Sequence, residues 1–489
     1  MDYSSDIIII GTGITGCAVA RSLSGFRCSV LVLERESDLA EGATKANSGI
    51  VHAGYDAVPG TKKAYYNVRG SAMYPGLCTE FGVPYRRCGS LVIGFDEQDR
   101  KTIEMLKNRG ETNGVPDLSI LERKELLTLE PNLNPSVLCA LSVPTGAIVS
   151  PYEMAFALAD DAAVNGVSFR FNDAVLSVSL LHEGGYSVKT SLAEYTCRVL
   201  VNCAGSSGAE IHNQLSDRKL AMVHRRGEYY LLDRTATHPF SRTVFQCPSV
   251  MGKGVLVTPT VHGNVLIGPN AEDIDDPLDT ATTSAGLSEV LQKAAKTWPA
   301  LSVKTNITNF SGVRAHLTTD DFMIGPVPGC PGYFEAIGIE SPGLSSAPAI
   351  AEDLSVMVSE YLGLKRKETR IPYSVPPRPF HDMTDAERVQ AVSSNAEYGN
   401  MICRCEMVTE AEIRYAIRRP VGARSIDGVK RRTRAGMGRC QGGFCMPRVA
   451  AILSEETGLA LTEITKNGGG SFLLSDSIDA FLEGVNTHE

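Results

Sequence analysis

Four cysteines near the C-terminus have residue types and spacing that suit a metal centre. Cys403 and Cys405 form a C-x-C pair, and Cys440 and Cys445 form a C-x4-C pair after a gap of 34 residues. Four thiolates on tight loops are typical of a small iron–sulfur cluster or of a structural zinc ion. Nearby glycines would let main-chain amides hydrogen-bond the sulfurs and tune the potential of a cluster: Gly436, Gly438, Gly442 and Gly443. These residues leave the choice between iron–sulfur and zinc open.

The N-terminus carries a glycine fingerprint that suits a dinucleotide. An apolar run over residues 5–10 predicts a buried strand, and the spacing G-x-G-x-x-G follows it at Gly11, Gly13 and Gly16. A small, apolar helical segment comes next, and a second apolar run over residues 28–33 ends at Glu34. In such a βαβ unit the helix N-terminus holds a pyrophosphate, and the acid accepts hydrogen bonds from a ribose. We therefore predict a dinucleotide site, against the alternative of a purely structural glycine turn.

One histidine close to this fingerprint is a candidate general base. His52 lies in a segment rich in glycine and small residues, 44–54, which permits close approach to a flat ring. Imidazole has a pKa near neutrality, so it can take a proton from a hydroxyl without a large perturbation. The alternative is a hydrogen-bonded structural histidine, and the small residues around His52 favour the catalytic interpretation.

A single arginine between apolar residues is a candidate anion site. Arg314 follows Gly312 beside a glycine turn, and a guanidinium matches planar or tetrahedral anions through its fork of donors. A salt bridge to Asp320 or Asp321 is the structural alternative. A second turn of small residues, 338–345, leads into a helix whose N-terminus suits the pyrimidine end of a flavin and would favour its anionic reduced form.

Length, charge and composition limit the class of protein. The 489 residues suggest about three domains at ~150 residues each, and 43% hydrophobic with 21% charged residues is typical of a globular protein. A net charge of −9 argues against broad nucleic-acid binding. The basic run 430–434 resembles a nuclear or nucleic-acid signal, but beside four thiolates we expect it to offset cluster charge or to dock an acidic electron partner. We expect no secretory signal and no membrane span, and thirteen dispersed cysteines predict reduced thiols in the cytosol.

The order of the expected elements predicts an α/β fold. Strands at 199–205 and 333–337 and helices at 152–165 and 345–361 would extend the N-terminal βαβ unit. Residues 227–268 alternate in polarity and predict antiparallel strands, which suit a sheet that covers a substrate.

Composition shifts mark the remaining segments. Residues 59–151 predict a mixture of short strands and helices, and the Pro-rich, polar stretch 366–398 predicts a linker. A helix over 409–419 follows the first cysteine pair, and the strip 464–471 is interpreted as flexible or ligand-contacting.

Together these motifs resemble a known family. The first 365 or so residues resemble the D-amino-acid-oxidase-like FAD superfamily, in the branch of FAD-dependent glycerol-3-phosphate dehydrogenases or oxidases and L-2-hydroxyglutarate dehydrogenases or oxidases. The residues that carry this resemblance are 47–54, 129–135, 201–205, 311–314 and 338–343. Residues 403–409 and 431–445 resemble the bacterioferritin-associated-ferredoxin-type [2Fe-2S] domain, which also ends the large subunit of anaerobic glycerol-3-phosphate dehydrogenase.

The resemblance implies a Rossmann-like FAD-binding domain, an antiparallel-sheet substrate domain and a small helical C-terminal [2Fe-2S] domain. The implied boundaries are 1–85, 150–215 and 320–365 for FAD binding, 86–149 and 216–319 for substrate binding, 366–398 for the linker, 399–457 for the [2Fe-2S] domain and 458–489 for a C-terminal tail.

The resemblance also implies residue roles. His52 would be the catalytic base, and the substrate would contact Arg314, Lys253 and Ser341. The implied FAD contacts are Gly11, Gly13, Ile14, Thr15, Gly16, Glu34, Arg35, Thr44, Asn47, Ser48, Gly49, Ala174, Val175, Ala204, Gly205, Gly312, Gly338, Gly343, Leu344 and Ser345. The implied cluster ligands are Cys403, Cys405, Cys440 and Cys445. Many relatives have a proline after the arginine, whereas this chain has Ala315, which leaves the backbone of the anion site less constrained.

The implied reaction is oxidation of sn-glycerol 3-phosphate to dihydroxyacetone phosphate by hydride transfer to flavin N5. Electrons would pass through the [2Fe-2S] cluster to an electron-accepting partner flavoprotein or subunit, with direct reoxidation by oxygen as the simpler alternative. Three other functions stay open: an L-2-hydroxy-acid dehydrogenase such as one for L-2-hydroxyglutarate, an amino-acid or opine oxidase, and a non-catalytic redox relay. We expect a small phosphorylated or carboxylated hydroxy substrate, no nucleic acid, and a cytoplasmic location in which peripheral contact with the inner face of the membrane stays open.

Overall fold

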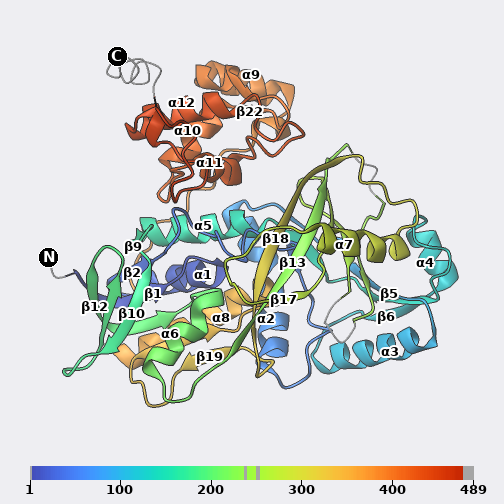
Figure 1. Ribbon diagram of the computed structural model, residues 1–489, viewed down its shortest axis with the longest axis horizontal. Helices are drawn as coiled ribbons and strands as arrows, with labels where there is room; N and C mark the ends of the chain where they lie inside the picture. The colour runs from blue at the N-terminus through green and yellow to red at the C-terminus, as the bar shows by residue number, and fades with distance from the viewer. Residues whose placement is uncertain (1–2, 236–238, 249–253, 477–489) are drawn as a thin grey trace, which may run out of the picture. The chain divides into compact units, whose positions relative to one another are not determined.

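Figure 1 shows the computed structural model, which describes residues 3–235, 239–248 and 254–476. The chain forms two compact units. The first comprises Met1–Leu33, Ala40–Ser168 and Val175–Ser374, and the second comprises Glu34–Leu39, Phe169–Ala174 and Val375–Glu489. The first unit holds the segments predicted to bind FAD and substrate, apart from the two short stretches that group with the second.

A mixed sheet, with eight strands among the described residues, has β1 (Tyr3–Ile10) near its centre. β1 pairs in parallel with β2 (Val30–Leu33) on one side and with β12 (Glu194–Asn202) on the other. Ile7, Ile8 and Ile9 are 0% exposed, which explains why the strand is apolar throughout instead of alternating. The order is β10–β11–β12–β1–β2–β9, with β20 beside β12 and β19 beside β20: β9 Val167–Arg170, β10 Val175–Leu180, β11 Tyr186–Thr190, β19 Met323–Pro326 and β20 Tyr333–Ile337.

Helices of the first unit pack beside this sheet (Figure 1): α1 Ile14–Leu23, α2 Lys62–Phe81, α5 Pro151–Val164 and α8 Gly343–Leu362, with the short α6 at Gly208–Leu215. α1 contacts α5 and α8, and α2 contacts α8. The helices predicted over 152–165 and 345–361 are confirmed within two residues at each end. The 20-residue α2 differs from the short elements expected in this region.

Both ends of α2 are well defined. Thr61 caps its N-terminus, and the Asp321 carboxylate accepts the main-chain N–H groups of Lys62 and Lys63, each at 3.0 Å. Gly82 ends the helix in the left-handed conformation with φ 65°. Because a helix N-terminus favours negative charge, Asp321 fixes α2 to the loop after β18 (Asn306–Leu317).

The second sheet has nine strands among the described residues and is mostly antiparallel. β13 pairs with β16, with Tyr230 opposite Ile267, and β18 runs antiparallel along the length of β13, which confirms the prediction for residues 227–268. β14 pairs in parallel with β5, which the sequence did not predict. The strands in spatial order are β17 Glu272–Ile274, β13 Met222–Leu232, β16 Val265–Gly268, β15 Leu256–Pro259, β14 Thr243–Gln246, β5 Ser90–Gly94, β7 Cys139–Val143 and β6 Ser119–Glu122.

Smaller elements complete the first unit. The helices α3 Glu97–Thr112, α4 Arg123–Leu129 and α7 Ser284–Thr297 lie against the second sheet. A three-stranded sheet has the order β3–β8–β4, with bounds Ile50–Val51, Ala147–Val149 and Tyr85–Arg86. β3 leads directly into His52.

The second unit is a small helical domain around a two-stranded ribbon. Its elements are α9 Asp385–Ser394, β21 Met401–Cys403, β22 Val408–Thr409, α10 Glu410–Arg418, α11 Ile426–Thr433 and α12 Met446–Thr457. Helix α10 confirms the helix predicted over 409–419, whereas the predicted linker contains α9 and a 3₁₀ turn at Ala396–Gly399. The strip 464–471 is a folded loop and not a flexible one: Ile464 is 0% exposed, and the Ile426 N–H donates to the Thr465 carbonyl at 3.1 Å.

Candidate active site and cluster site

The fingerprint glycines allow β1 and α1 to approach each other closely. Gly11 has φ +98°, and a Cβ on Gly16 would lie 2.0 Å from the Gly11 carbonyl oxygen. Gly13 occupies the N-cap position of α1 and has no side chain that could cap the helix. The positive N-terminal end of α1 can therefore bind an anion such as a pyrophosphate. Ile14 and Thr15 form the first turn, and the Ile14 N–H donates to Thr44 Oγ1 at 2.9 Å.

Glu34 directly follows β2, as expected for a ribose-binding acid. Its carboxylate accepts the N–H of Glu36 at 3.0 Å, and its carbonyl accepts the N–H of Asp173 at 2.9 Å. Two further predicted FAD contacts come next after Asp173: Ala174 and Val175. Arg35 forms an ion pair with Glu36 at 3.0 Å, so the structure gives Arg35 a partner other than a nucleotide.

The segment before His52 is a tight turn built by Asn47. The Asn47 amide donates to the Thr44 carbonyl at 2.8 Å, and the Gly49 N–H donates back to Asn47 Oδ1 at 2.8 Å. Gly49 has φ +66°, and a Cβ there would lie 2.7 Å from the Val149 carbonyl oxygen. Ser48 is half-buried between them. Asn47 and Gly49 therefore shape the loop that leads to the candidate base.

His52 is held through its main chain by a residue of α8. Its N–H donates to Ser345 Oγ at 2.7 Å, and Ser345 is 0% exposed. The His52 ring lies 5.7 Å from the Phe245 ring, centroid to centroid, in a tilted arrangement. The structure therefore brings the His52 loop and the start of α8 together, which supports the assignment of both to one site.

The turn before α8 contains further predicted residues. Gly338 has φ +69°, and a Cβ there would lie 2.4 Å from the Leu317 side chain, so only glycine fits. Ser341 is exposed, Gly343 begins α8, and the Leu344 carbonyl accepts the Tyr74 hydroxyl at 2.6 Å. Two other predicted residues follow β12 instead: Ala204 and Gly205.

Arg314 lies on β18, close to the His52 loop in the fold. Two residues earlier on this strand, a Cβ on Gly312 would lie 2.1 Å from the carbonyl oxygen of Ala46, so β18 abuts the loop that precedes His52. The Arg314 guanidinium donates to main-chain carbonyls, including that of Asn270 at 2.8 Å and that of Arg226 at 3.3 Å. Burial lowers the pKa of Arg314, which shows the energetic cost of holding this charge away from water.

The expected alternative, a salt bridge from Arg314 to Asp320 or Asp321, is wrong. Asp320 pairs with the Lys63 ammonium at 3.0 Å, and Asp321 caps α2. Within the described ranges, no carboxylate lies within 4.0 Å of the Arg314 guanidinium. The predicted substrate residue Lys253 lies outside the described residues.

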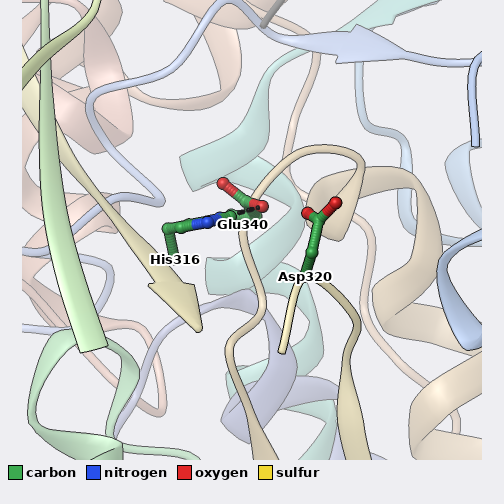
Figure 2. Close-up of side chains that lie close together, drawn as sticks. All are labelled: His316, Asp320 and Glu340. Atoms are coloured by element: carbon green, nitrogen blue, oxygen red, sulfur yellow. Dashed lines mark hydrogen bonds and ion pairs between the residues drawn. The ribbon is translucent and has the colours of Figure 1, made fainter. Parts of the chain in front are cut away.

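A cluster of ionisable side chains lies at the end of β18. Figure 2 shows His316, Asp320 and Glu340 close together, and one ligand atom of each lies within 4.8 Å of the others. The His316 Nδ1 atom is 2.8 Å from Glu340 Oε1. The Lys63 ammonium lies 2.8 Å from Glu340 and 3.0 Å from Asp320, so both carboxylates already have an internal cation as partner. We interpret the group as an ion-pair cluster and not as a metal site.

The four C-terminal cysteines form two pairs, each with one residue from either motif. Cys405 Sγ lies 3.6 Å from Cys440 Sγ. The second pair is Cys403 and Cys445, where the neighbouring Cys445 side chain and the main chain at Gly436 and Glu406 lower the pKa of Cys403. This effect agrees with the predicted approach of main-chain amides to a ligand sulfur.

This pairing discriminates between one metal ion and two. Four thiolates around a single zinc ion would all lie roughly 3.8 Å apart, given Zn–S bonds of about 2.3 Å. In the part of the chain that the structure describes, His316, Asp320 and Glu340 are the only three such ligand groups within 4.8 Å of one another, so no three cysteine sulfurs converge. Two pairs of thiolates fit the two irons of a [2Fe-2S] cluster.

The arginines of the basic run 430–434, predicted to offset cluster charge or to dock an acidic partner, form ion pairs inside the second unit. Arg431 and Arg432 both pair with Asp38, at 3.1 and 2.6 Å, and the Arg432 side chain is 0% exposed. Arg434 pairs with Glu406 at 2.9 Å. The side chains of the run are thus engaged by carboxylates of this chain.

Comparison with known proteins agrees with this geometry. Residues 6–357 match the FAD dependent oxidoreductase model of the DAO family, and residues 401–455 match the BFD-like [2Fe-2S] binding domain. The chain belongs to the DAO family of FAD dependent oxidoreductases. A glycerol 3-phosphate dehydrogenase of Caloramator mitchellensis is 45% identical over 96% of this chain and 98% of that relative.

Two further relatives each cover about three quarters of this FAD dependent oxidoreductase. The structure of L-alpha-glycerophosphate oxidase from Mycoplasma pneumoniae with FAD bound is 28% identical, with a TM-score of 0.72 over 77% of this chain and 99% of that chain. The mitochondrial L-2-hydroxyglutarate dehydrogenase of Arabidopsis thaliana is 28% identical over 72% of this chain and 82% of that relative.

The comparisons confirm the predicted cofactors, FAD and a [2Fe-2S] cluster, and decide the choice that the cysteine spacing left open between iron–sulfur and zinc. The alternative of a non-catalytic redox relay is not supported, because the FAD dependent oxidoreductase match covers most of the chain. No helix among residues 3–235, 239–248 and 254–476 has the length and apolar character to cross a membrane.

Proposed function

We propose that this FAD-dependent dehydrogenase oxidises sn-glycerol 3-phosphate to dihydroxyacetone phosphate. The relatives named glycerol 3-phosphate dehydrogenase and oxidase support this substrate, and the dehydrogenase from Caloramator matches nearly the whole chain. The observation in this chain that carries the proposal is the Arg314 guanidinium, which donates to the main-chain carbonyls of Arg225, Arg226 and Asn270.

Arg314 would bind the phosphate of the substrate. A half-buried guanidinium without a carboxylate partner among the described residues retains an unbalanced positive charge, which a dianionic phosphate can neutralise. Lys253 and Ser341, both predicted from the resemblance, would complete the anion site. Gly312 brings this strand against the loop that carries His52, so phosphate binding and proton transfer would occur on adjacent segments.

His52 would take the proton of the C2 hydroxyl as the C2 hydride leaves, giving the ketone. When bound, FAD supplies the two-electron acceptor for that hydride, and the cluster supplies a one-electron outlet. An imidazole is a common general base, and a positioned general base contributes roughly 10²–10⁴ in rate. Phe245 packs against one side of the ring and limits the directions from which a hydroxyl can approach.

We further propose an electron-accepting partner, either a flavoprotein or another subunit. A two-electron oxidation coupled to a one-electron centre needs an acceptor that takes electrons singly or in two steps. The dispersed, reduced cysteines favour a cytoplasmic location, and a peripheral contact with the inner face of the membrane would bring the protein to membrane-bound acceptors.

An L-2-hydroxy-acid dehydrogenase is the main alternative, because Arg314 would bind a carboxylate equally well. The relative from Arabidopsis is named as an L-2-hydroxyglutarate dehydrogenase. Steady-state rates with an artificial electron acceptor separate the two. We expect kcat/KM for sn-glycerol 3-phosphate to exceed that for L-2-hydroxyglutarate, glycine or L-proline by at least about tenfold. Faster turnover of L-2-hydroxyglutarate would reject our substrate, and faster turnover of an amino acid would place the chain with the amino-acid oxidases.

Substitution of Arg314 tests the anion site in the same assay. Arg314→Gln should raise KM for glycerol 3-phosphate, since it removes the charge that binds the phosphate. Arg225→Gln is the matched control, because Arg225 is a neighbouring arginine on β13 whose charge is already paired with Asp273 at 2.6 Å. Equal effects of both substitutions would contradict a specific role for Arg314.

A further inference from the structure

We propose that Asn67 on helix α2 is a positioning residue for His52, and that it acts together with Ser345 by holding both main-chain polar groups of the base. This inference rests on the proposed function, in which His52 removes the hydroxyl proton. Neither the glycine fingerprint nor the His52 motif indicates Asn67, which lies in a helix that the sequence did not predict.

Side chains from two helices, α8 and α2, form hydrogen bonds with the main-chain N–H and carbonyl of His52. The N–H donates to Ser345 Oγ at 2.7 Å, and the carbonyl accepts the side-chain amide of Asn67. Strand β3 ends at Val51, so the ladder of this small sheet stops one residue before His52. Because buried main-chain groups need partners, the two side chains replace the missing strand bonds and fix the position of the residue.

Asn67 belongs to a stripe of four residues along one face of α2, namely Lys63, Asn67, Gly70 and Tyr74, and this stripe faces the site. Residues at intervals of three or four lie on one face of a helix. Lys63 binds the Glu340 carboxylate at 2.8 Å, a Cβ on Gly70 would lie 2.1 Å from the Ser345 carbonyl oxygen, and the Tyr74 hydroxyl donates to the Leu344 carbonyl at 2.6 Å. Asn67 lies between them in the same stripe.

The stripe joins the two halves of the site through a rigid element. Asn67 contacts the His52 loop, whereas Lys63, Gly70 and Tyr74 contact the segment from Glu340 to Ser345. That segment includes Ser341, the predicted substrate contact. Helix α2 therefore sets the distance between base and substrate turn, and Asn67, which is 2% exposed, is the member that reaches the base.

The chemistry explains why an asparagine is suited to this position. The side-chain amide carries N–H donors for the His52 carbonyl and stays neutral, so it adds no charge beside the imidazole. Leucine would fill a similar volume but leave the carbonyl unpaired, and aspartate would present an acceptor to an acceptor. A misplacement of about 1 Å in a reacting group costs up to about 10² in rate.

The test compares Asn67→Ala and Asn67→Leu with Tyr186→Phe in the full-length holoenzyme. Tyr186→Phe is the matched control, because Tyr186 is buried on β11, away from the stripe and from His52, and the substitution removes one hydrogen bond, from its hydroxyl to the Pro331 carbonyl at 3.0 Å. We expect the Asn67 variants to lose roughly 10- to 100-fold in kcat with KM changed less than about threefold, and with FAD content equal to that of the wild type. Tyr186→Phe should retain kcat within about twofold while losing thermal stability to a similar extent.

A double-mutant cycle separates positioning of His52 from a general loss of structure. If Asn67 acts through His52, adding Asn67→Ala to His52→Ala should lower kcat by less than about twofold further. A full additional loss in the double variant, or a loss in Asn67→Ala no greater than in Tyr186→Phe, would overturn the proposal. The proposed substrate is tested separately by the wild type, because every ratio here is measured with whichever substrate gives the highest wild-type rate.

Discussion

The main-chain nitrogen of His52 lies 2.7 Å from the hydroxyl oxygen of Ser345, although 293 residues separate them in the chain. This bond joins the loop after the dinucleotide fingerprint to the first turn of α8. Ser345 was expected to contact FAD, and the structure assigns its hydroxyl to His52. The base and the turn that carries Ser341 therefore form one unit of structure.

Removal of the imidazole tests the catalytic role. We expect His52→Ala to lower kcat by roughly 10²–10⁴, because a positioned general base contributes that much to the rate. FAD should remain bound, since the side chain of His52 takes no part in the glycine turn. Stopped-flow measurement of flavin reduction is the direct assay, and near-normal reduction would remove His52 from the mechanism.

Alanine substitutions at the fingerprint glycines should differ in their effects on stability and on FAD binding. Gly16→Ala places a methyl group 2.0 Å from a carbonyl oxygen, so we expect a loss of about 1–3 kcal/mol in stability. Gly13→Ala meets no protein atom nearer than 3.4 Å and has φ −64°, so the apoprotein should keep its melting temperature while FAD binding weakens. Calorimetry of the apoproteins and FAD titration distinguish the two. Equal melting temperatures of both variants would contradict this account of Gly16.

If the cysteine pairs hold the cluster, loss of the cluster should stop electron transfer out of the protein without affecting reduction of the flavin. Cys405→Ser breaks one pair, so the purified protein should lose iron and acid-labile sulfide. Substrate should still reduce the flavin at the wild-type rate, whereas transfer to a one-electron acceptor should fall by at least about tenfold. Cys330→Ser, a substitution at a buried cysteine outside the cluster motifs, is the control. Unchanged one-electron transfer without iron would show that the cluster is not on the electron path.

The buried ion pair between Asp38 and Arg432 should give the protein an acid-sensitive contribution to stability. Burial alone would raise the pKa of Asp38, but Arg432 and Arg431 outweigh it and lower the pKa below its usual range. A carboxyl with a lowered pKa stabilises the fold above the unfolded-state value near 3.9 and loses that contribution as pH falls through the folded value.

Asp38→Asn should therefore cost about 3–5 kcal/mol near pH 7, because it leaves two buried guanidinium groups with an incomplete partner. The difference from the wild type should shrink below about pH 4. Glu368→Gln, which removes the exposed partner of Arg27, should change stability by less than about 1 kcal/mol. Calorimetric melting of all three proteins between pH 3 and pH 7 measures these differences, and a pH-independent gap would contradict the ion-pair explanation.

Local patterns predicted the nucleotide-binding turn because its signature lies in one short segment of sequence. The apolar run of β1, the three glycines and the acid after β2 all lie within 34 residues, although the close approach at Gly11 is to the distant Cys203. The cysteine motifs were predicted for the same reason. Their assignment to two pairs needed the structure, since spacing does not reveal which sulfurs lie together.

Helix α2 shows what sequence periodicity could not provide. Its helical pattern is interrupted by Gly70 and Pro75 and by the buried polar residue Asn67. Gly70 is required because a Cβ would meet the Ser345 carbonyl, and Asn67 is buried because His52 needs a partner. Gly70 and Asn67, which interrupt the helical sequence pattern, are thus also residues that form the site. In the same way, the ion pairs of the basic run with the distant Asp38 could not be predicted from the run itself.

The most direct test of the account is an anaerobic titration of the purified holoenzyme with sn-glycerol 3-phosphate, followed by visible absorbance and electron paramagnetic resonance. We predict that the visible flavin band bleaches and that the signal of a reduced [2Fe-2S] cluster grows as substrate is added. A flavin band that persists with glycerol 3-phosphate, or bleaching without any paramagnetic cluster signal, would contradict an oxidation whose electrons leave through the C-terminal cysteines.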